Sequence, residues 1–117
     1  TRDFTYISDI VEVLIKSSKS NLTQEIFNIG SGRTVSINYI VKLLKGKKVK
    51  IPKRPGEPEI TFADISKVKK KLKWKPKIKI EKGIKLLLEN LDYWKSAPVW
   101  TPKKIAIATK DWFKYLK

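Results

Sequence analysis

Apolar and polar residues alternate along this chain mostly with the period of helices. Between residues 36 and 46, apolar side chains recur at intervals of three, four and seven positions, which places them on one face of a helix. Ser36 is a suitable N-cap for this helix, and Gly46 is a suitable residue to end it. Similar patterns predict further helices that begin after Ser8 or Asp9, after Asp64, at Ile80 or Glu81, and at Thr101-Pro102.

Short runs of alternating or β-branched residues separate these helices. They cover residues 4–7, 25–29, 34–35, 48–51 and 60–62 and predict short strands. The regular strand–helix series of a Rossmann sheet is not visible. The sequence therefore predicts one small α+β domain that is mostly helical.

Two of the predicted helices carry wide apolar faces. The first is predicted to run from Ile80 or Glu81 to the break at Pro98, and the second follows Thr101-Pro102. Aromatic residues in a terminal helix belong more often to a core than to an interface. The buried faces would hold Ile84, Leu87, Leu88, Leu91 and Trp94 in the first helix, and Ile105, Ala108, Trp112 and Leu116 in the second.

Composition removes several kinds of chemistry. The 117 residues include no cysteine and no histidine, which excludes disulfides, thiolate ligands, cysteine nucleophiles and the commonest general base and metal ligand. No metal site is therefore expected. No apolar run approaches the roughly 18 residues of a membrane span, and no signal peptide is visible. The expected location is cytoplasmic, without a membrane partner.

The net charge of +16 leaves two interpretations open. A polyanionic partner is one, since residues 67–85 contain ten lysines around Trp74. The other is a set of solvated lysine faces, because 24 of the 27 basic residues are lysine and these alternate with Ile78 and Ile80. The second interpretation is preferred. A free-standing basic module for nucleic acid or another polyanion stays as the alternative function.

The turn at Lys53–Pro58 is the strongest candidate for binding chemistry. Two prolines and a glycine constrain it around Arg54 and Glu57. A guanidinium is a planar fork that suits phosphate oxygens, and a carboxylate three residues later can accept from sugar hydroxyls. Solvated charges on a loop are the alternative explanation.

This turn is one of five motifs that occur in a fixed order. They are Arg2–Tyr6 (RDFTY), Phe27–Gly32 (FNIGSG), Arg54–Pro58 (RPGEP), Ala63–Lys67 (ADISK) and Leu72–Lys77 (LKWKPK). Their order resembles the C-terminal half of the extended short-chain dehydrogenase/reductases, the NAD-dependent nucleotide-sugar epimerases and dehydratases around UDP-glucose 4-epimerase. The resemblance covers roughly residues 1 to 95.

The resemblance implies three substrate-binding residues. Arg2 and Arg54 would contact the pyrophosphate of a nucleotide sugar, with UDP-sugars favoured, and Glu57 would hold a ribose hydroxyl. The alternative for Arg2 is a salt bridge to Asp3 or Asp9, and for Glu57 it is solvation. Asp9 and Asp64 are better explained as helix caps than as ligands.

The catalytic and cofactor motifs of these enzymes are not found in the chain. None of the four tyrosines is followed by the lysine of a Tyr-x-x-x-Lys pair. Gly30-Ser31-Gly32 lacks the third glycine of a dinucleotide loop, since position 35 is Val, and reads as a turn. No catalytic or cofactor-binding residue is therefore expected within residues 1–117.

The expected protein is thus the substrate-binding C-terminal domain of an NAD-dependent epimerase or dehydratase, most simply an isomerase. The chain opens with Thr1 directly inside a motif, which suggests a fragment whose N-terminal Rossmann half supplies NAD binding and the Tyr/Lys pair. Alone it would not catalyse, and a face that should pack against that half would favour self-association. Lys73 stands where the family pattern usually has glycine, and a left-handed backbone there would cost on the order of 1 kcal/mol.

Overall fold

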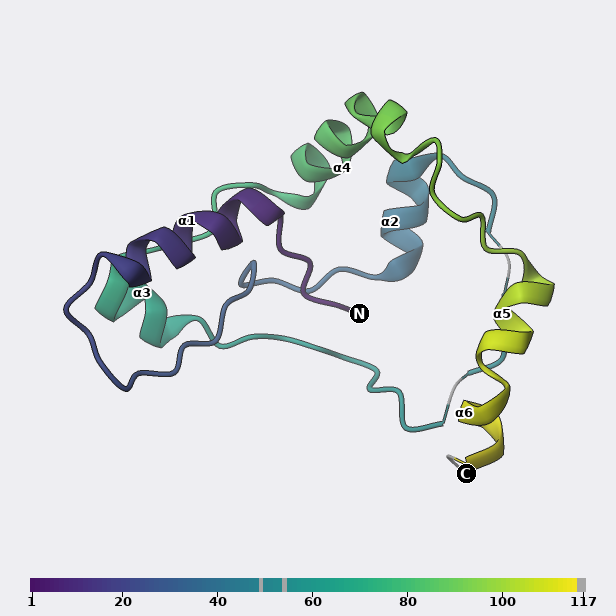
Figure 1. Ribbon diagram of the computed structural model, residues 1–117, viewed down its shortest axis with the longest axis horizontal. Coiled ribbons are helices and arrows are strands. Elements are labelled where there is room, and N and C mark those ends of the chain that lie inside the picture. The colour runs from purple at the N-terminus through teal and green to yellow at the C-terminus, as the bar shows by residue number, and fades with distance from the viewer. Residues whose placement is uncertain (49, 54, 116–117) are drawn as a thin grey trace.

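The computed structural model describes residues 1–48, 50–53 and 55–115. Within them the chain forms helices joined by long extended segments (Figure 1). The helices are α1 (Ile7–Ser18), α2 (Ile37–Leu44), α3 (Ser66–Leu72), α4 (Ile80–Glu89), the 3₁₀ helix η1 (Leu91–Trp94), α5 (Pro102–Ala108) and α6 (Lys110–Tyr115). None of the helices described is long and apolar enough to cross a membrane.

The mostly helical character is as predicted, whereas the short strands are not found in the described residues. The one β-type pairing there is an isolated antiparallel bridge between Arg2 and Val35, with both N···O distances 2.9 Å. Residues 4–6, 25–29 and 60–62 run without a ladder; the run 48–51 includes Val49, which lies outside the described residues. Alternation favours an extended backbone, but a strand also needs a neighbour at about 4.8 Å.

A small core lies where α1 packs on α3. The Trp74 side chain just after α3 is 1% exposed. Partly buried Phe27, Ile29 and Ala63 pack against this cluster. The core residues are Val13 of α1, Val68 and Leu72 of α3, and the flanking Ile65 and Trp74.

Helix ends follow the sequence signals closely at α2 and α5. The Ser36 hydroxyl accepts from the backbone N–H of Tyr39 at 3.1 Å, and the Thr101 hydroxyl accepts from Lys104 at 3.3 Å, with proline next in the chain. The C-terminal prediction for α2 was wrong by one residue. Lys45, and not Gly46, takes the left-handed conformation with φ 53°.

The two aspartates expected as caps behave differently. The N-cap position of α3 is Ile65, and Asp64 just before it accepts from the N–H of Ser66 at 2.9 Å; hydrogen bonds from the side chain and the backbone of Ser66 lower the pKa of Asp64. Asp9 does not cap α1, which begins at Ile7. The Asp9 carboxylate is buried and accepts from the backbone N–H groups of Lys77 and Ile78 at 3.1 and 3.0 Å. It therefore connects α1 to the segment before α4.

The predicted buried face of the fourth helix is largely open. The single long helix expected here is divided into α4 and η1, and Leu91 and Trp94 are each 51% exposed. The last predicted helix is likewise two, α5 and α6; Ile105 and Trp112 are half-buried, Ala108 is exposed, and Leu116 lies outside the described residues.

The molecule is open rather than compact. In Figure 1, α1 and α3 lie at one end and α5 and α6 at the other, with α2 and α4 between. The radius of gyration is 17.5 Å, against about 13 Å for a compact domain of this length. The accessible surface is 9736 Å², against about 6,600 Å² for a globular monomer of this mass. Much apolar surface therefore stays exposed.

Candidate functional site

Arg2 and Glu57 meet in space although 55 positions separate them. The Arg2 guanidinium lies 2.8 Å from Glu57 Oε1, and the two side chains are 25% and 30% exposed. Arg2 also donates to the backbone oxygens of Thr1 and Glu59 at 2.8 and 3.2 Å. Neither alternative weighed from the sequence describes this pair, since the partner of Arg2 is not Asp3 or Asp9 and Glu57 is not merely solvated.

Backbone pairing fixes Arg2 beside the turn. The bridge to Val35 holds its main chain, and the N–H of Thr61 donates to the carbonyl of Thr1 at 3.3 Å. A charge-assisted pair in this half-buried setting orients the guanidinium while leaving it accessible. An anion that entered here would compete with Glu57 for the same donors.

Further hydrogen bonds hold the proline–glycine turn in place. Arg54 lies outside the described residues, but its neighbour Pro55 accepts a hydrogen bond from the Trp112 indole at 2.7 Å. Gly56 follows with φ +70°, a conformation that glycine adopts without strain. Lys53 and Glu59 pair across the turn at 2.7 Å, and this hydrogen bond raises the pKa of Lys53 and lowers that of Glu59.

Asp3 is a junction that the sequence did not reveal. Its carboxylate accepts from the N–H and hydroxyl of Ser31 at 2.6 and 2.5 Å and from the N–H of Ala63 at 3.3 Å. A Cβ on Gly30 would stand 2.5 Å from Asp3 Oδ2, so this glycine allows a close approach. The Ser31 amide is used by Asp3, which fits the turn predicted for Gly30-Ser31-Gly32 and not a dinucleotide loop.

Glu81 is a second junction that sequence reasoning missed. It accepts from the Arg33 guanidinium at 2.9 Å and from the Tyr39 hydroxyl at 2.9 Å. Hydrogen bonds from its own backbone and from Tyr39 lower the pKa of Glu81, and the same contact raises the pKa of Tyr39. Glu81 thereby joins the glycine turn, α2 and α4. No spacing pattern in the sequence indicates that Arg33 and Tyr39 would meet Glu81, or that Arg2 and Asp3 would meet their own partners.

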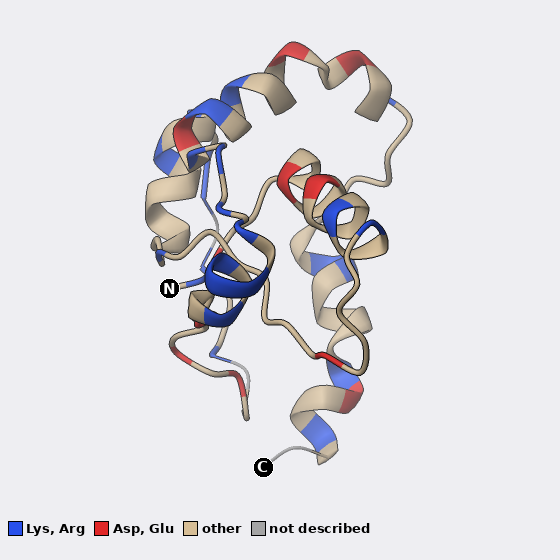
Figure 2. Cartoon of the chain, turned by 90° about the vertical axis from the view of Figure 1, so that its left-hand side faces the viewer, with Lys and Arg blue, Asp and Glu red and all other residues tan. Residues whose placement is uncertain are grey.

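Several of the clustered lysines have carboxylate partners. Figure 2 faces the end of the molecule that carries α3, where lysines are dense. Lys67 and Lys71 both bind Glu25, and these hydrogen bonds lower the pKa of Glu25 to about 2. Lys77 pairs with Glu12 at 2.7 Å. These pairs favour the interpretation of solvated lysine faces over a polyanion track. No group of metal ligands occurs among the described residues.

Comparison with known proteins identifies the class. The family described as GDP-mannose 4,6 dehydratase matches residues 1–87. A UDP-glucuronate 4-epimerase of Thermodesulfobacterium geofontis is 43% identical over 109 residues, covering 84% of this chain and 33% of that protein.

Two solved structures have the same fold. The UDP-glucose 4-epimerase of Thermotoga maritima with UDP-glucose is 34% identical, with a TM-score of 0.71 over 78% of this chain and 31% of that one. The enzyme WbmF of Bordetella bronchiseptica in complex with NADH is 20% identical, with a TM-score of 0.63 over 99% of this chain and 35% of that one. The second likeness concerns the fold alone.

The fold and these relatives define a class, the nucleotide-sugar epimerases and dehydratases of the extended short-chain dehydrogenase/reductases. Within it, the chain belongs to the family described as GDP-mannose 4,6 dehydratase. The chain spans about a third of the length of the relatives it matches.

Proposed function

We propose that residues 1–117 form the nucleotide-sugar-binding part of an NAD-dependent epimerase or dehydratase, with a UDP-sugar as the preferred substrate. Arg2 and Arg54 bind the pyrophosphate, and Glu57 accepts a hydrogen bond from a ribose hydroxyl. An isomerase reaction is the simplest assignment, because two relatives named as 4-epimerases are 43% and 34% identical to this chain over the matched residues.

The observation that carries the proposal is the meeting of Arg2 with Glu57. It brings the RDFTY motif to the RPGEP turn, so that one guanidinium already points at the turn that contains the second arginine in sequence. Two guanidiniums bound to one diphosphate would give the bidentate, charge-assisted contacts that suit its oxygens. When substrate binds, phosphate oxygens replace Glu57 on Arg2, and the released carboxylate becomes available to a sugar hydroxyl.

The chemistry itself belongs to the remainder of the enzyme. A bound NAD there would supply transient oxidation of a sugar hydroxyl and return of the hydride, with a Tyr/Lys pair as the base. The described residues do not fit a dinucleotide, because the amide of Ser31 in the Gly30-Ser31-Gly32 turn is bound to Asp3. The open shape and exposed apolar surface agree with a complementary Rossmann half as partner.

Calorimetric titration of the complete protein with UDP tests the assignment. Arg54→Ala is expected to weaken UDP binding by about 1.5–3 kcal/mol, the range for hydrogen bonds to charged groups. Arg33→Ala is the matched control, because it removes an equal charge from a residue that binds Glu81, and it is expected to bind UDP like the wild type. If Arg54→Ala binds UDP with the wild-type affinity, the assignment of Arg54 is wrong.

A further inference from the structure

The helices α5 and α6 contact the proline–glycine turn through a directional bond. Trp112 of α6 donates its indole N–H to the carbonyl oxygen of Pro55 at 2.7 Å, across 57 positions in sequence. Both residues are half-buried. A hydrogen bond of this length in a partly shielded place has a defined geometry, so it fixes where the Pro55 peptide lies.

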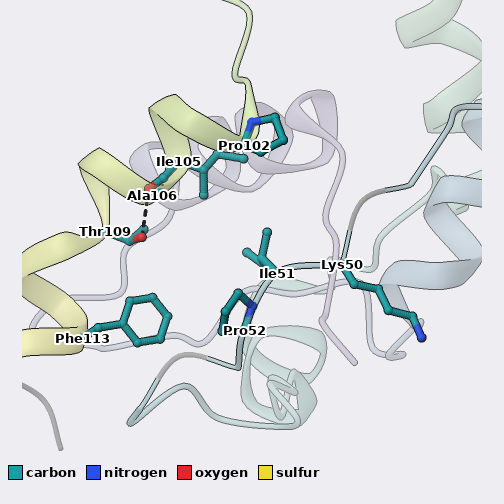
Figure 3. A pocket seen from close by; sticks show the side chains of 8 residues that line it. All are labelled: Lys50, Ile51, Pro52, Pro102, Ile105, Ala106, Thr109 and Phe113. Atoms are coloured by element: carbon teal, nitrogen blue, oxygen red, sulfur yellow. Dashed lines mark hydrogen bonds between the residues drawn. The ribbon is translucent and has the colours of Figure 1, made fainter.

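The rest of this contact region is apolar. Ile51 and Pro52, which precede the turn, face Ile105 and Phe113 across a cavity of about 330 Å³ (Figure 3). Thr109 also lines it, but its hydroxyl donates to the carbonyl of Ile105 within α5 at 2.9 Å. Apolar contact is non-directional, so it brings the helices near the segment without fixing the turn's orientation. The Trp112 bond supplies that orientation.

Pro55 stands two residues before Glu57, and only Gly56 separates them. Glycine is the most flexible residue in the chain, so the direction of Glu57 depends on what holds its neighbours. On one side Arg2 holds the Glu57 carboxylate at 2.8 Å, and on the other Trp112 holds the Pro55 carbonyl. If a phosphate displaces Glu57 from Arg2, the Trp112 bond continues to hold the turn.

We infer that Trp112 is a positioning residue for the substrate: it keeps the turn of residues 55–57 in the orientation that presents the Glu57 carboxylate to the ribose of a nucleoside diphosphate. This inference rests on the proposed function. It adds the C-terminal helix pair, which lies outside the residues matched by the family, to the construction of the binding site.

The test uses the complete protein with two variants, Trp112→Phe and Trp100→Phe. The first keeps an aromatic ring and removes the indole N–H together with the five-membered ring that carries it. The second makes the same change at a tryptophan that is 64% exposed and does not line the cavity. Three quantities are measured: exchange of the four backbone N–H groups in residues 56–60 (Pro58 has none), affinity for UDP by calorimetry, and melting temperature.

For Trp112→Phe we expect faster amide exchange in residues 56–60 and about a two- to tenfold weaker affinity for UDP, the effect of one lost hydrogen bond. Exchange around Val13 and Val68, and the melting temperature, should stay at wild-type values. Trp100→Phe should match the wild type in all three. A merely structural tryptophan would instead alter the core exchange and the melting temperature.

The outcomes are separable from those of the proposed function. Wild-type exchange in residues 56–60 of Trp112→Phe, or faster exchange with unchanged UDP affinity, overturns the inference. Failure of the wild-type protein to bind UDP overturns the proposed function, and the exchange data alone then decide whether Trp112 holds the turn. A general loss of structure in Trp112→Phe alone would show a core role and also contradict the inference.

Discussion

At the scale of single residues, carboxylates determine how distant segments meet. Asp3 binds two segments, Asp9 binds the chain before α4, and Glu81 binds Arg33 and Tyr39. The donors that Asp3 and Asp9 bind are partly buried, and leaving one buried donor unpaired costs about 1–3 kcal/mol, whereas the Arg33–Glu81 pair is exposed. In a chain with few other core contacts, such bonds carry much of the specificity of the fold.

Glu25 gives a pH-dependent prediction at this scale. Its hydrogen bonds to Lys67 and Lys71 lower its pKa from 4.5 to about 2. A carboxylate with a depressed folded-state pKa stabilises the fold above its unfolded pKa, and this contribution is lost as the pH falls from about 4.5 towards 2. Glu25→Gln should therefore melt below the wild type at about pH 6, and the gap should narrow by about pH 3.

Thermal melting of the complete protein at several pH values provides the measurement. Glu89→Gln serves as control, because Glu89 is half exposed and lies 3.8 Å from its lysine partner; it should change the melting temperature little. A wild-type to Glu25→Gln gap that is the same at about pH 6 and about pH 3 would contradict the assigned ion pairs.

At the scale of elements, the ends of the helices explain most of what the sequence predicts well. Side-chain caps at Ser36 and Thr101 are local, so sequence suffices to find them. C-terminal ends depend on which residue accepts a left-handed backbone. Lys45 and Lys73 do so with φ 53° and 50°, where glycine would be unstrained.

Lys73→Gly is therefore expected to stabilise the protein by about 1 kcal/mol, because it removes the Cβ clash of the left-handed conformation. The urea midpoint of the complete protein should rise. Lys75→Gly is the matched control: its φ is not positive, so the added flexibility should leave stability unchanged or lower it. If both variants lower the midpoint, left-handed strain at Lys73 is not significant.

Contacts between separate segments are what the sequence could not predict. Alternating patterns predicted short strands, but whether such runs pair depends on neighbours that no local pattern specifies, and only Arg2 and Val35 do so in the part of the chain described. The candidate site shows the same division. Motif order pointed to Arg2 and Glu57 as substrate-binding residues, which stays a prediction, while their contact with each other and the Trp112 bond required three dimensions.

At the scale of the whole molecule, the exposed apolar surface is the main feature to explain. Faces that the sequence predicted to be buried remain exposed, including Leu91 and Trp94, and on α1 the side chains of Ile7 and Leu14 are 66% and 62% exposed. Burying apolar surface is the main favourable term in folding, at roughly 25 cal/mol per Å². Such faces, in a chain that spans a third of its relatives' length, are the surfaces we expect the Rossmann half to cover.

The most direct test of the central claim is a crystal structure of the complete protein with UDP. We predict that the pyrophosphate lies at the Arg2–Glu57 pair, with phosphate oxygens at about 3 Å from the guanidinium nitrogens of Arg2 and Arg54. Glu57 should have left Arg2 for a ribose hydroxyl, and Trp112 should still bind Pro55. A nucleotide bound elsewhere, with the Arg2–Glu57 salt bridge intact, would contradict the account.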